Sequence, residues 1–166
     1  MSAKRLTHMA LLTAVALGIF IVELQLPSLA PIPGIKLGLA NIVTLYAMFV
    51  LGPGDALGIL LARILLGGMF SGQMMSLFYS LAGGLLCYLV TLLTRKLFTL
   101  KQIWVCSVLG AAAHNLGQIA AAILITRTPA LIYYLPVLIV SGILTGVFTG
   151  FCAQFAVNKM PVKPGK

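Results

Sequence analysis

The sequence consists of apolar stretches separated by short segments rich in turn-forming or basic residues. Six stretches are present, over about residues 6–26, 37–51, 55–70, 74–93, 103–125 and 131–157. A bilayer core about 30 Å thick needs about 20 apolar residues in helical conformation, so the second and third stretches are short for a crossing. Only 8% of the residues are charged, against roughly 25% in soluble domains. We predict one all-α integral membrane domain over residues 1–166, a bundle of six transmembrane helices.

Turn-forming residues separate the predicted helices. Pro27, Pro31 and Pro33 follow the first stretch, and proline ends a helix because it lacks the N–H donor and fixes φ. Gly52-Pro53-Gly54 separates the second stretch from the third, and residues 126–129 form a predicted turn before the sixth.

The basic residues indicate how the bundle is oriented. Three groups lie beside helix ends: Lys4 and Arg5; Arg95, Lys96 and Lys101; Lys159, Lys163 and Lys166. Lys and Arg near helix ends stay on the cytoplasmic side, and an even number of crossings places all three groups there. We therefore predict a multi-pass protein of the cell membrane with both termini cytoplasmic. The net charge of +9 reflects topology, and we expect contact with membrane lipid and none with nucleic acid.

Polar residues inside the apolar stretches are costly, which makes each of them a candidate for function. On the predicted topology most of them fall in the outer half of the bundle, with Arg63 nearer the middle. They predict an outward-facing pocket for a small molecule, formed by Glu23, Lys36, Asn41, Arg63, Gln73, Tyr79, His114 and Gln118.

Structural interpretations of these residues remain open. Lys36 could extend along the bilayer to reach head groups, and Glu23 could form an ion pair with Arg63, which could instead bind an anionic ligand. Asn115 and its neighbour His114 could form hydrogen bonds between helices, which for Asn115 is the favoured interpretation.

The residue types needed for several kinds of chemistry are missing. The only acids are Glu23 and Asp55, too few to hold magnesium on a diphosphate or to form a catalytic carboxylate pair. No GxxxxGK[ST] loop for ATP is present. We expect no enzymatic activity, no cofactor and no metal site. If the protein moves a substrate actively, the energy comes from a source other than its own ATP hydrolysis, and a proton-coupled carrier could use Glu23 or His114 as its titratable group.

Small residues recur every fourth position in five of the stretches, which allows another helix backbone to approach closely. The sets are Ala10, Ala14 and Gly18; Gly54, Gly58 and Ala62; Ser76, Ser80 and Gly84; Ala113, Gly117 and Ala121; Gly142, Gly146 and Gly150. Each set fits packing within the bundle or docking to another membrane subunit.

Three segments resemble the Gx transporter family, whose members are often labelled heptaprenyl diphosphate synthase component I. They are PGIKLGLANIVTL at residues 33–45, LGP at 51–53 and RILLGG at 63–68, and the resemblance spans nearly the whole chain. With its six short helices and an AxxxA pattern at Ala10 and Ala14, the chain also looks like the substrate-binding S components of energy-coupling factor transporters.

The S-component resemblance implies uptake of a small vitamin-like or other organic nutrient. It also implies docking through Ala10 and Ala14 to a transmembrane coupling subunit that carries two ATPase subunits. The family label suggests an alternative, a membrane accessory of heptaprenyl diphosphate or quinone biosynthesis.

Overall fold

The computed structural model describes residues 2–26, 36–72 and 74–159, and within these ranges all regular secondary structure is helical. The six α-helices are α1 (Ala3–Leu24), α2 (Asn41–Val50), α3 (Pro53–Ser71), α4 (Met74–Thr94), α5 (Ile103–Thr126) and α6 (Leu135–Lys159). Two short 3-10 helices, η1 (Leu100–Gln102) and η2 (Pro129–Tyr134), precede α5 and α6. The prolines predicted to form the first loop lie outside the described residues.

Five helices, all except α2, are long and apolar enough to cross a membrane. The predicted second transmembrane helix, 37–51, is wrong in extent, because α2 has ten residues and a rise of about 15 Å, half the thickness of the bilayer core. The residues before it, 36–40, are not helical, and Gly38 has a φ of +80°. The predicted all-helical bundle is therefore observed with five helices long enough to span a membrane and one half-length helix.

The second segment nevertheless extends along most of α1. Gly38 contacts Glu23 near the end of α1, whereas Asp55, just after α2, contacts Arg5 near its beginning. Non-helical residues rise about twice as much per residue as helical ones. The non-helical residues before α2 and the ten residues of α2 together therefore extend along most of the length of α1.

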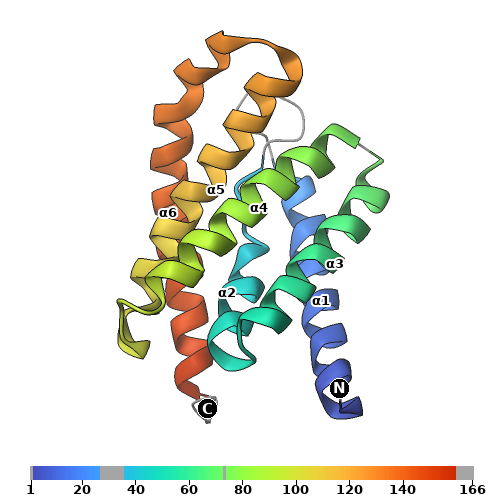
Figure 1. Cartoon of the computed structure of the whole chain (residues 1–166), viewed down its shortest axis with the longest axis vertical. Coiled ribbons are helices and arrows are strands. Elements are labelled where there is room, and N and C mark those ends of the chain that lie inside the picture. Colours follow the sequence, from blue (N-terminus) through green and yellow to red (C-terminus); the bar gives the residue numbers. More distant parts are fainter. Residues whose placement is uncertain (1, 27–35, 73, 160–166) are drawn as a thin grey trace.

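Helix α2 lies at the centre of the bundle (Figure 1). It contacts each of the other five α-helices, and six of its ten residues, Val43 to Met48, are buried. Non-helical backbone at membrane depth is tolerated where protein covers it. The central position of this segment therefore accounts for the break before α2.

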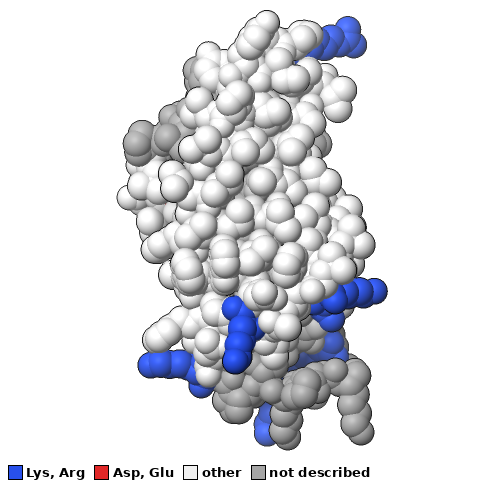
Figure 2. Space-filling view, turned by 90° about the vertical axis from the view of Figure 1, so that its left-hand side faces the viewer, with Lys and Arg blue, Asp and Glu red and all other residues white. Residues whose placement is uncertain are grey.

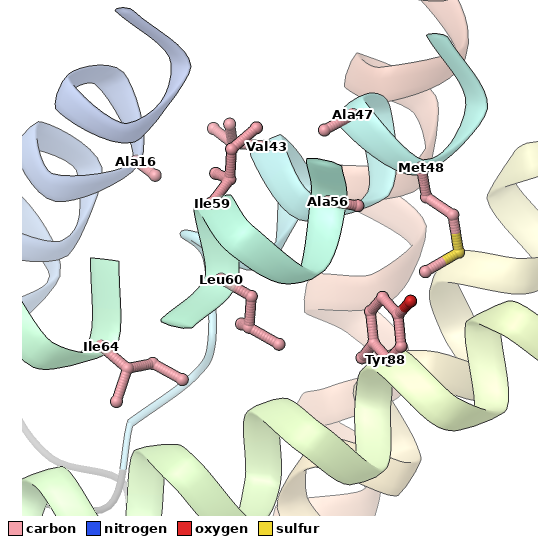
Figure 3. Packing of buried hydrophobic residues seen from close by; sticks show 9 residues of the cluster. All are labelled: Ala16, Val43, Ala47, Met48, Ala56, Ile59, Leu60, Ile64 and Tyr88. Atoms are coloured by element: carbon pink, nitrogen blue, oxygen red, sulfur yellow. The ribbon is translucent and has the colours of Figure 1, made fainter. Parts of the chain in front are cut away.

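An apolar core joins α2 to its neighbours on one side. Figure 3 shows Val43, Ala47 and Met48 of α2 facing side chains from three other helices. These are Ala16 of α1, Ala56, Ile59, Leu60 and Ile64 of α3, and Tyr88 of α4. Tyr88 is the polar member, and its hydroxyl donates to the Pro53 carbonyl at 3.1 Å.

On the face drawn in Figure 2, most of the basic side chains lie at the end of the molecule where α1 begins and α6 ends (Figure 1). Basic colour also appears at the opposite end in Figure 2, and Arg127 follows the last residue of α5. At the basic end, Arg5 forms a two-pronged ion pair with Asp55, with both N···O distances 2.7 Å. This pair joins the first turn of α1 to the first turn of α3.

Candidate functional site in the broken second segment

The candidate site is built around the backbone of the non-helical residues before α2. The Gly38 N–H donates to Glu23 Oε1 at 2.5 Å, which fastens this segment to the end of α1. A Cβ atom at position 38 would lie 2.8 Å from His114 Cδ2 and 2.9 Å from Asn41 Nδ2. Glycine is therefore required here both by the positive φ and by the close approach of α5.

Arg63 points into this region from α3. Its side chain is 3% exposed, and its Nη2 donates to Asn41 Oδ1 at 3.1 Å. Its Nε has no hydrogen-bond partner among the described residues. The ion pair between Glu23 and Arg63 considered from the sequence is not formed: Glu23 accepts from Gly38, and the ion pair found in the described ranges is that of Arg5 with Asp55.

Lys36 turns inward. Its Nζ lies 3.8 Å from the centroid of the Phe20 ring, a cation–π contact, and it has no hydrogen-bond partner within the described ranges. The sequence left open that Lys36 extends toward the lipid head groups, but its ammonium group instead lies over the Phe20 ring.

Helix α5 contributes His114 and Gln118, which lie one turn apart and are both buried. Gln118 Oε1 accepts from the Lys36 backbone N–H at 3.4 Å, while its Nε2 has no partner in the described part of the chain. Gly83 of α4 makes room for them, since a Cβ there would lie 2.7 Å from Gln118 Cγ. Asn115 points elsewhere and donates to the Leu138 carbonyl of α6, the interhelical role favoured from the sequence.

Six of the eight predicted site residues come together around the break. They form what we call the polar cluster: Glu23, Lys36, Asn41, Arg63, His114 and Gln118. Tyr79 is not joined to it by these contacts and packs in an apolar cluster with Ile119 and Leu138. The eighth residue, Gln73, lies outside the described residues.

Sequence reasoning missed three residues at this site: Gly38, Phe20 and Thr44. Thr44 lies one turn beyond Asn41 on α2, is buried, and its Oγ1 has no partner among residues that the structure describes. A small pocket of about 20 Å³ beside it is lined mostly by α2, α4, α5 and α6, and that volume is enough for one water molecule. The glycine in KLGLAN was a usable signal, whereas Phe20 and Thr44 resemble ordinary apolar-helix residues.

Comparison with known proteins gives one match. A family model described as heptaprenyl diphosphate synthase component I matches residues 12–156. Neither the curated proteins nor the solved structures include a significant match.

Proposed function

We propose that this chain, which belongs to the heptaprenyl diphosphate synthase component I family, is the substrate-binding subunit of an energy-coupling factor type transporter. It would bind a small organic nutrient within the membrane, and partner subunits would hydrolyse ATP. The protein itself would not be an enzyme.

The observation that carries this proposal is the polar cluster at the break before α2. Buried polar atoms are nearly always paired, yet Lys36 Nζ, Arg63 Nε and Gln118 Nε2 lack partners within the described ranges. Membrane transporters place substrate sites where a helix is interrupted, because the unwound backbone supplies polar groups there. A bound molecule would satisfy these atoms.

The surface of α1 supports docking to a second membrane protein. Glycines in the stripes of α4, α5 and α6 face neighbouring helices: a Cβ at Gly117 would meet α4, and one at Gly146 would meet α5. By contrast Ala10, Ala14 and Gly18 are exposed, and nothing lies within 4 Å of a Cβ at Gly18. Ala10 and Ala14 line a groove of about 430 Å³ between α1 and α3, whose far side includes Gly58 and Ala62. A helix of the coupling subunit fits this small-residue groove.

Bulky side chains in the groove test the docking. We expect the double variant Ala10→Trp/Ala14→Trp to lose co-purification with the coupling subunit, because the two indoles fill the space that a partner helix needs. Leu144→Trp is the matched control, since Leu144 is 67% exposed on α6 and lies outside this groove. Equal co-purification of the double variant and the control would contradict the docking role.

The family description also names an association with prenyl diphosphate synthesis, which favours a second candidate, a membrane accessory of heptaprenyl diphosphate or quinone biosynthesis. This candidate expects the protein to stimulate a prenyltransferase catalytic subunit. A prenyltransferase assay with and without the reconstituted protein separates the two, because a nutrient-binding subunit leaves that rate unchanged.

A further inference from the structure

We infer that the polar cluster binds the anionic group of its ligand, a carboxylate or a phosphate. This inference rests on the proposed function for the presence of a transported ligand. It adds the chemical class of that ligand, from the charges and the unpaired atoms of the site.

The first step is the charge balance. The polar cluster contains two cations, Lys36 and Arg63, and one carboxylate, Glu23, so its formal charge is +1. The only other acid in the entire sequence is Asp55, which is held by both prongs of Arg5. No other acidic side chain of this protein can therefore neutralise the cluster.

The second step is that burial makes this imbalance costly. Arg63 is 3% exposed and Glu23 is 5% exposed, and a charge without a counter-charge in such surroundings is strongly disfavoured. Glu23 is already engaged by the Gly38 N–H. An anion from outside the protein would restore neutrality, whereas a cation would double the excess charge.

The third step is the type of atom left without a partner. In the polar cluster, Lys36 Nζ, Arg63 Nε, Gln118 Nε2 and His114 Nδ1 have none in the described ranges. The first three are hydrogen-bond donors, and the imidazole nitrogen can donate or accept according to its tautomer. The three donors come from the segment before α2, from α3 and from α5. Arg63 also donates to Asn41, the first residue of α2, and Gln118 accepts from the Lys36 backbone N–H. The positive end of the α2 dipole adds to the attraction for an anion. Three donors and no free carboxylate match the oxygens of a carboxylate or phosphate.

Simple anions test the inference on the purified, detergent-solubilised full chain at neutral pH. Its unfolding temperature is measured while sodium acetate, or separately sodium phosphate, replaces sodium chloride at constant ionic strength, with acetamide as the neutral analogue of acetate. We expect a saturable rise with acetate, phosphate or both, and none with acetamide. A rise with acetate alone assigns a carboxylate, and a rise with phosphate alone assigns a phosphate.

Variants separate this site from general salt effects on stability. Lys36→Met should weaken the apparent affinity about tenfold or more, the loss of one charge-assisted hydrogen bond, and Arg63→Met should do the same. Lys36→Arg should retain binding. Glu23→Gln keeps an acceptor for Gly38, and because it raises the formal charge it should bind the anion at least as tightly.

The inference is overturned if the wild-type protein shows no saturable anion effect, or if Lys36→Met responds like Lys36→Arg. Lys36 lies outside the helices, so this pair of variants remains informative even if Arg63→Met does not fold. Anion binding without association with a coupling subunit would leave the inference standing and reject the transporter role. Association with a coupling subunit without anion binding would support the transporter role and reject the inference of an anionic ligand.

Discussion

Gly38 ties the non-helical backbone before α2 to the polar cluster through its hydrogen bond to Glu23. Its positive φ turns its N–H toward Glu23, and its missing side chain leaves room for the His114 ring. An alanine would have to adopt a conformation that L-residues avoid and would press on His114 and Asn41 at the same time. The geometry of the site therefore depends on one residue that contributes no side chain.

At the residue scale, we predict that Gly38→Ala lowers the free energy of unfolding by about 2 kcal/mol or more, from the positive φ and the steric overlap together. Gly72→Ala is the matched control, because Gly72 also has a positive φ, 63°, but nothing lies near its Cβ position; it should lose about 1 kcal/mol. Reversible unfolding in mixed micelles measures both. Equal losses would show that His114 yields freely to a side chain at position 38.

Among the elements, α1 and α6 use small residues in opposite ways. Gly142, Gly146 and Gly150 of α6 lie against α5, where an added Cβ would come within 2.8 Å of another atom at each position. The small-residue stripe of α1 is exposed, and the buried residues of that helix are Ala16, Phe20 and Glu23. The glycines of α6 therefore allow α6 to pack closely on α5, whereas the small residues of α1 lie on a face that no other described helix of the bundle covers.

At the element scale, we predict that Gly146→Ala destabilises the protein by about 1 to 3 kcal/mol, because its Cβ would lie 2.8 Å from Val108 Cα, a backbone atom that cannot rotate away. Gly18→Ala should be neutral or slightly stabilising, since its Cβ meets open space and alanine favours the helix. Thermal unfolding of the two variants in the same detergent makes the comparison. A stable Gly146→Ala would mean that α5 and α6 separate easily.

The whole molecule has a basic end and an end with little charge. Figure 2 shows this distribution on one face, and Figure 1 shows both ends of the described chain at the basic end. The Arg5–Asp55 ion pair lies at the same end, and the polar cluster lies nearer the other, close to the last turn of α1. This asymmetry predicts one preferred orientation in a membrane.

For the whole molecule, we predict that both termini face the cytoplasm and that Arg127 faces outward, because positive charge near helix ends is retained inside. Green fluorescent protein fused after Lys166 should fluoresce, and a cysteine introduced at position 127 should react with an impermeant maleimide on intact cells. Cysteine at position 96 is the control and should react only after permeabilisation. Labelling at 96 and not at 127 on intact cells would reverse the orientation.

The sequence by itself determined that this protein is surrounded by lipid and that its basic residues are grouped beside helix ends. Long apolar stretches must be helical in lipid, because only helices satisfy their own backbone hydrogen bonds there, and α1, α3, α4, α5 and α6 follow from that rule. Intramembrane polar residues are few and costly, which is why Glu23, Arg63 and Gln118 could be selected without a structure. The rule extended a helix too far at residues 37–40, where the Gly38 N–H donates to the Glu23 carboxylate instead of to a helix carbonyl.

Only the tertiary structure decided which polar residues meet and which small residues stay open. The pairing of Gly38 with Glu23 and of Lys36 with Phe20 joins positions 15 and 16 residues apart, and that of Arg63 with Asn41 joins two helices. Periodicity places residues on a face of their own helix but carries no information about the neighbouring helix. For the same reason the stripes on α1 and α6 look alike in sequence, and only the packing shows that one is covered and the other exposed.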